Sequence, residues 1–61
     1  MKKQEQEHSL KCLREAVDHF EKRYIRQALE LEKGQRGKTA KALGIDRKTL
    51  YIKMKKYELI Q

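Results

Sequence analysis

The sequence predicts an all-α protein in which a long N-terminal helix precedes a helix-turn-helix, and in which two copies form a homodimeric helical bundle. Three observations predict this fold. Residues 10–32 contain no glycine or proline and carry apolar side chains at spacings of three and four, as an amphipathic helix does. Gly44 separates two short segments that carry helical signals. A chain of 61 residues is one domain with a marginal core, so a second copy is expected to complete it.

The first element is the long helix, expected from Leu10 to about Glu32 with Ser9 as its cap. At ~1.5 Å per residue it would be about 34 Å long. It would then be longer than the helix-turn-helix that it supports, so part of it is expected to project. The polar residues 1–9 are expected to be the remnant of a linker to an upstream segment, which leaves residues 10–61 as the folded domain.

The apolar stripe of this helix is narrow in its N-terminal part, as in a coiled coil, and Ile25 and Leu29 widen it toward a second direction. The wide part suits burial within the chain, and the narrow part suits a partner helix. We therefore expect a homodimer. Packing of the narrow part within one chain is the alternative, but little else in the sequence is available to cover it. The expected dimer interface contains Leu10, Leu13, Val17, Phe20 and Tyr24.

The first short helix is expected over Lys38–Leu43. Gly34 and Gly37 are expected to mark the end of the long helix and the start of this one. Gly44 can adopt the left-handed conformation that ends a helix. Ile45 follows it and is expected to be an apolar residue that packs into the core.

The second short helix is expected to start at Arg47, because Asp46 is a good N-cap residue and Thr49 follows it by three positions. Its buried stripe should contain Leu50, Met54 and Tyr57. The side chains expected to point away from the core are Lys48, Tyr51, Ile52 and Lys55. An apolar back and a cationic outer face are what a helix needs to lie in the major groove of DNA.

The positive charge is concentrated in the second half of the chain. The formal net charge is +7, and residues 34–61 hold eight basic residues against two acidic ones. Such an asymmetry favours a polyanionic partner, since neutralised phosphates release counterions. The alternative is a basic face that serves only solubility.

Other classes of function lack support in the sequence. It has no Ser-His-Asp arrangement, no paired catalytic carboxylates and no glycine-rich phosphate loop, so an enzyme and a bound cofactor are not expected. His8, Cys12, Glu15 and His19 have a spacing that could hold a metal. They lie opposite the apolar stripe, however, and are more simply exposed to solvent, so no metal is expected. The single cysteine and the lack of a signal peptide or membrane-spanning run favour a cytoplasmic protein without a membrane partner.

The order of residues over about 10–60 closely resembles the Fis-type DNA-binding domain. That domain is the C-terminal domain of the sigma-54-dependent activators of the nitrogen-regulator (NtrC) type and makes up most of the nucleoid protein Fis. The residues that carry the resemblance are Ala16-Val17, Phe20-Glu21-Lys22, Ile25, Ala28-Leu29, Gly34, Ala40, Leu43-Gly44-Ile45, Arg47, Thr49-Leu50-Tyr51 and Lys53-Met54-Lys55-Lys56-Tyr57.

The resemblance implies a dimer that binds inverted repeats in double-stranded DNA. Base contacts are then expected from Arg47, Lys48, Tyr51 and Ile52. Phosphate contacts are expected from Gln35, Gly37, Lys38, Thr49, Lys53, Lys55 and Lys56. The leading interpretation is the DNA-binding module of a sigma-54-dependent activator, with ATPase and regulatory domains upstream. A free-standing architectural protein that bends DNA and a pure dimerisation module are the alternatives.

Four positions depart from the family pattern. Gln35 and Gly37 stand where Asn and a hydroxyl residue are common, so the helix start there is expected to depend on main-chain amides. Arg36 replaces a common apolar residue, and its stem can still lie along the core. Glu58 replaces the glycine that usually follows the last tyrosine, which leaves the end of the last helix without its usual cap residue.

Overall fold

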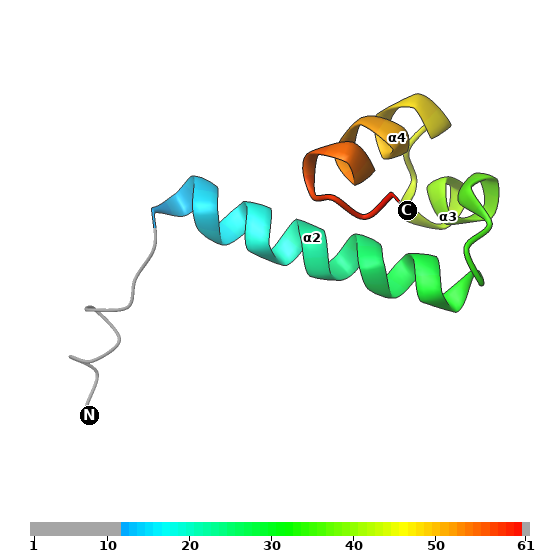
Figure 1. The fold of residues 1–61 in the computed structure, drawn as a ribbon, viewed down its shortest axis with the longest axis horizontal. Coiled ribbons are helices and arrows are strands. Elements are labelled where there is room, and N and C mark those ends of the chain that lie inside the picture. The colour runs from blue at the N-terminus through cyan, green and yellow to red at the C-terminus, as the bar shows by residue number, and fades with distance from the viewer. Residues whose placement is uncertain (1–11, 61) are drawn as a thin grey trace.

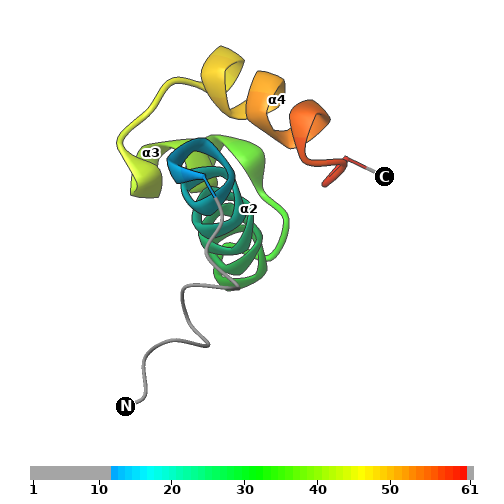
Figure 2. The same cartoon turned by 90° about the vertical axis from the view of Figure 1, so that its left-hand side faces the viewer.

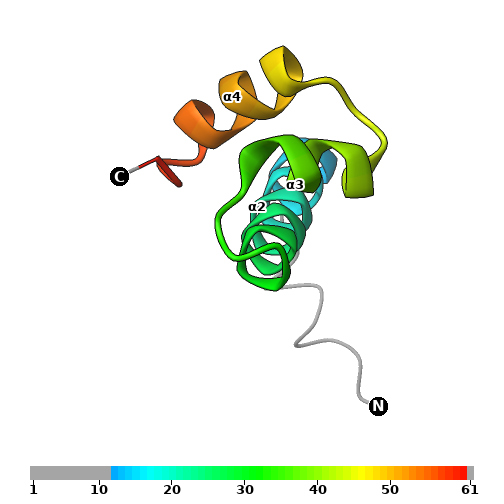
Figure 3. The same cartoon turned by 90° about the vertical axis from the view of Figure 1, so that its right-hand side faces the viewer.

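The computed structural model describes residues 12–60, and the regular structure within this range is entirely helical. Helix α2 spans Leu13–Leu31, α3 spans Arg36–Leu43 and α4 spans Arg47–Lys56 (Figure 1). Both short helices lie on the same side of α2, and α4 runs across it (Figures 2 and 3). The N-terminal end of α2 extends beyond them, as the predicted length required.

Helix α2 confirms the long helix over the described range. Its N-cap residue is Cys12, whose side chain makes no capping hydrogen bond; the expected start at Leu10 and cap at Ser9 lie outside the described residues. The helix ends at Leu31, and Gly34 has a φ of 80°. The Gly34 amide donates to the Leu29 carbonyl at 2.8 Å, so Gly34 closes the helix as predicted.

Helix α3 begins two residues earlier than predicted, at Arg36 rather than Lys38. The carbonyl of Gln35 accepts the Thr39 amide at 2.9 Å and the Thr39 hydroxyl at 2.8 Å. This backbone carbonyl therefore starts the helix without a side-chain cap, and Gly37 lies inside the first turn. The prediction that Gly37 marks the helix start was wrong, because the Gln35 carbonyl already starts the helix two residues before it.

The turn between α3 and α4 has the predicted geometry. Gly44 has a φ of 74°, and the Ile45 amide donates to the Ala40 carbonyl at 3.0 Å. The Asp46 carboxylate accepts the Thr49 amide at 2.7 Å, so α4 starts at Arg47. Hydrogen bonds from Thr49 lower the pKa of Asp46.

A small core holds the three helices together. Its buried apolar residues are Ile25, Ala40, Leu50, Met54 and Tyr57, with Thr39 fully buried beside them. The half-buried residues that pack against it are Leu29, Leu43, Ile45, Leu59 and Ile60. The predicted stripe of α4 is thus confirmed, and the wide part of the α2 stripe is buried within the chain as expected.

The end of α4 is closed without a glycine. Glu58 adopts a left-handed conformation with a φ of 58°, and the Leu59 amide donates to the Met54 carbonyl at 2.8 Å. The chain then folds back so that Leu59 and Ile60 pack on the core. The helix stop therefore forms although the preferred residue is missing.

Candidate nucleic-acid interface

The outer face of α4 combines cations with exposed apolar side chains. Lys48, Tyr51, Ile52 and Lys55 are all exposed, which confirms the predicted division of the helix. Tyr51 is 47% and Ile52 55% exposed. The ammonium group of Lys55 lies 5.7 Å from the centroid of the Tyr51 ring, within the range of a cation–π contact.

A cationic hollow lies between the first turns of α3 and α4. It is lined by Arg36, Arg47 and Lys48 together with Leu50 and Tyr51. A Cβ atom on Gly37 would lie 4.0 Å from Nε of Arg47, so the Arg47 side chain passes close to the first turn of α3. The hollow therefore gathers positive charge from both helices of the motif.

The residues expected to contact phosphate differ in their exposure to solvent. Gln35, Gly37, Lys38 and Lys55 are exposed, and the first three surround the start of α3. Thr49 is half-buried, and its amide is engaged by Asp46.

Lys53 and Lys56 face α2 instead of the outer face of α4. Lys53 forms an ion pair with Glu21 at 3.0 Å, and Lys56 forms one with Asp18 at 3.3 Å. The Tyr57 hydroxyl donates to Glu21 and, at 3.2 Å, to Asp18. These five side chains, which we call the α2–α4 polar cluster, fix the last turn of α4 against the middle of α2.

The polar cluster changes the protonation of its members. The Tyr57 hydrogen bond and the Lys53 contact lower the pKa of Glu21. Burial, and then the hydrogen bond to Glu21, raise the pKa of Tyr57. The sequence pattern assigned no structural role to Asp18 or Glu21, although Glu21 precedes the buried Ile25 by one helical turn. That spacing was the available signal that its carboxylate lies near the core.

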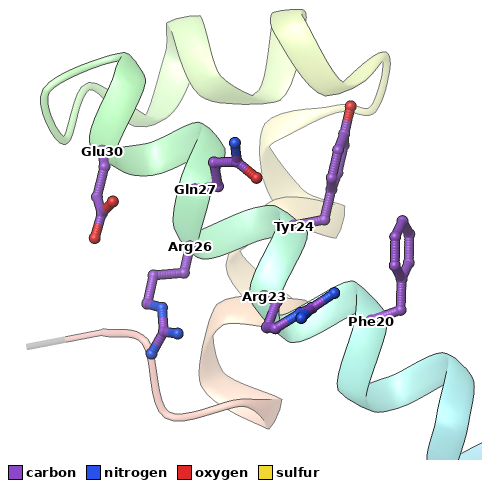
Figure 4. Close-up of a pocket in the computed structure, with 6 residues that line it drawn as sticks. All are labelled: Phe20, Arg23, Tyr24, Arg26, Gln27 and Glu30. Atoms are coloured by element: carbon purple, nitrogen blue, oxygen red, sulfur yellow. The ribbon is translucent and has the colours of Figure 1, made fainter.

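A strip of apolar side chains along α2 is exposed. Leu13 is 79% exposed, and Val17, Phe20 and Tyr24 are each at least half exposed. The rings of Phe20 and Tyr24 stack with their centroids 5.5 Å apart, and both leave α2 on the same side (Figure 4). We call these four residues the α2 strip; the fifth expected interface residue, Leu10, lies outside the described residues.

A comparison with protein-family models decides the family. The model described as bacterial regulatory protein, Fis family, matches residues 16–57. The chain belongs to the Fis family. The match includes most of α2 and the whole of α3 and α4, which agrees with DNA binding and a role in transcription regulation. Comparisons with curated proteins and with solved structures found no match for this Fis-family chain.

Over residues 12–60, no three His, Cys, Asp or Glu side chains come together in a way that could hold a metal ion. In the same part of the chain, no helix has the length and apolar character needed to cross a membrane. His8, one of the four residues whose spacing could hold a metal, lies outside this range.

Proposed function

We propose that this Fis-family domain binds inverted repeats in double-stranded DNA as a homodimer, as the DNA-binding module of a sigma-54-dependent activator. In such a protein, ATPase and regulatory domains would precede it. The observation that carries the proposal is the outer face of α4, which is cationic and exposed and lies opposite the buried stripe of Leu50, Met54 and Tyr57. A helix with one exposed cationic face can enter the major groove while its buried face packs against the rest of the domain.

Base contacts are assigned to Arg47, Lys48, Tyr51 and Ile52, which stand at the start or on the outer face of α4. A guanidinium near the start of such a helix can donate two hydrogen bonds to the O6 and N7 atoms of guanine. Arg47 occupies the first position of α4, so it is the leading candidate for that contact.

Phosphate contacts are assigned first to residues whose polar groups are free to reach out. These are Gln35, Gly37, Lys38 and Lys55, all exposed, with Thr49 at the rim of the motif. Lys53 and Lys56 are expected to contribute less, because each already neutralises a carboxylate of α2 and would have to leave it.

The homodimer is supported by the α2 strip. The four large apolar side chains of the α2 strip form a surface that a soluble monomer rarely leaves uncovered. A second copy of α2 would cover it, with the two recognition helices placed about a two-fold axis. This symmetry is what an inverted repeat matches.

The experiment contrasts two cations of the motif. An operator is first selected from a random duplex library, and each variant is then titrated on it and on a scrambled duplex at two salt concentrations. Arg47→Ala should cost about 1–3 kcal/mol on the operator and little on the scrambled duplex. Lys38→Ala should weaken both alike and lower the salt slope by about one per subunit.

The result decides whether the domain reads bases, bends DNA without reading them or does not bind DNA. Equal losses on both duplexes for Arg47→Ala would mean that α4 reads no bases, and the domain would then be an architectural DNA-bending protein. Binding that is absent at low salt for the wild-type chain would leave only the dimerisation module.

A further inference from the structure

Ile52 is the exposed aliphatic side chain on the outer face of α4, which it shares with Lys48, Lys55 and the Tyr51 ring. Its side chain is 55% exposed, and it follows Leu50 and precedes Met54 by two positions. At ~100° per residue, two positions correspond to about 200° around the helix. Leu50 and Met54 are both buried, so Ile52 lies on the opposite side of α4 and is among its outermost side chains.

We propose that Ile52 contacts the C5-methyl group of a thymine in each half-site; this inference rests on the proposed function. The thymine methyl is the one apolar group that a base pair of unmodified DNA presents in the major groove. The outermost side chain of a helix lying in that groove comes closest to the base edges. Ile52 therefore meets this methyl group, where a lysine would be better suited to a phosphate or a guanine.

The surroundings of Ile52 favour DNA over a protein as its occupant. Lys48 precedes Ile52 by four positions and Lys55 follows it by three, so both lie beside it on the same face. One isoleucine and one tyrosine ring among ammonium groups provide far less surface than the ~800 Å² that each partner buries in a stable protein interface. DNA fits this arrangement, because the two lysines can reach phosphates while Ile52 meets a methyl group in the groove.

Neighbouring Tyr51 is less suited to the same contact. Lys55 lies 5.7 Å from the centroid of its ring, so part of the ring surface already faces an ammonium group. Tyr51 also lines the cationic hollow with Arg36 and Arg47. Ile52 is therefore the side chain on the outer face best placed to present only carbon to a base edge.

The position of the thymine follows from the helix geometry. Arg47 and Ile52 are five residues apart, which is about 7.5 Å along an α-helix. Base pairs are separated by ~3.4 Å, so the thymine should lie about two base pairs from the guanine that Arg47 contacts.

The first test uses the wild-type chain and the selected operator. Each thymine is replaced in turn by deoxyuridine, which removes only the methyl group. We expect one thymine per half-site at which the replacement lowers affinity about three- to five-fold, and no change at thymines that α4 does not approach. No loss at any position, with sequence-specific binding intact, would overturn the inference and leave the proposed function standing.

The second test assigns the methyl contact to Ile52. Ile52→Ala should bind the thymine operator about three- to five-fold more weakly and lose its sensitivity to deoxyuridine at that position. Lys48→Ala, on the same face, is the matched control and should keep the full sensitivity. Full sensitivity in Ile52→Ala would overturn the assignment. Because Ile52 is exposed, the fold should be retained, and an unchanged thermal unfolding curve checks this.

The third test separates thymine from 5-methylcytosine, which carries the same methyl group. The T·A pair is replaced by 5-methylcytosine·G and by C·G, and the wild-type chain should bind the T·A duplex most tightly. Tighter binding to the 5-methylcytosine duplex would overturn the assignment to thymine. If no operator can be selected and no salt-dependent binding occurs, the proposed function fails, and the inference fails with it.

Discussion

Tyr57 joins α4 to α2 through its hydroxyl group. The ring is 8% exposed, and the hydroxyl donates to Glu21 and Asp18. Since Tyr57→Phe keeps the ring and removes only this donor, it should lower the free energy of unfolding by about 1 kcal/mol. Urea unfolding of the two proteins measures the difference. Tyr51→Phe, at an exposed ring, is the control and should have almost no effect; equal losses in both variants would contradict the role of the polar cluster.

Glu21 makes the free energy of unfolding depend on pH in the acidic range. Its pKa lies below the ordinary value of 4.5, so the folded chain binds this proton less tightly than the unfolded chain. The contribution is therefore present above pH 4.5 and is lost as the pH falls through the folded-state pKa. We expect Glu21→Gln to be less stable than wild type at pH 6, with the gap closing toward pH 3. Glu30→Gln, at an exposed position of α2, is the control, and a gap that stays constant with pH would contradict the prediction.

Glu58 holds a left-handed conformation that costs a residue with a side chain about 1–2 kcal/mol. Glycine has no such cost, and the hydrogen bond from Leu59 to Met54 does not involve the Glu58 side chain. Glu58→Gly should therefore stabilise the domain by about 1 kcal/mol, measured as a higher midpoint of thermal unfolding. The same change inside a helix, Glu30→Gly, should destabilise it by a similar amount. A loss of stability in Glu58→Gly would show that its side chain is needed.

At the scale of the elements, local signals predicted the motif well. Gly44 and Asp46 each act through neighbours within five positions, so the turn and the start of α4 are visible in the sequence. The start of α3 was missed because it depends on the Gln35 carbonyl, which every residue type possesses. The polar cluster was missed because Tyr57 meets carboxylates 36 and 39 positions away, and no local pattern records which helix faces come together.

Because of the polar cluster, the lysines of α4 have two different roles, contact with DNA and contact with α2. Lys55 is exposed on the outer face, whereas Lys53 is bound to Glu21. Lys55→Ala should lower the salt slope of DNA binding by about one per subunit and leave stability almost unchanged. Lys53→Ala should change the slope less and should lower the free energy of unfolding by up to about 1 kcal/mol, as for a partly exposed ion pair. Equal slopes for both variants would mean that Lys53 leaves Glu21 to reach a phosphate.

At the scale of the whole molecule, α3 and α4 cover only part of the length of α2 (Figure 1). The five buried apolar residues lie where α3 and α4 cover α2, and the uncovered part of α2 carries the α2 strip. A domain of this size draws only about 3–5 kcal/mol from its core. Association through the α2 strip would therefore contribute a large share of the total stability.

Phe20 is the position at which the proposed dimer is most directly tested. Phe20→Glu would place two carboxylates near the two-fold axis, which should cost several kcal/mol of association, and sedimentation at tens of micromolar should then show a monomer. His19→Glu introduces the same charge one position away, on an exposed side of α2 outside the strip, and should remain a dimer. Because a dimer gains stability by mass action, the thermal midpoint of the wild-type chain should rise with protein concentration, whereas that of Phe20→Glu should not. A Phe20→Glu protein that stays dimeric, or a wild-type midpoint independent of concentration, would mean that the α2 strip does not pair two chains.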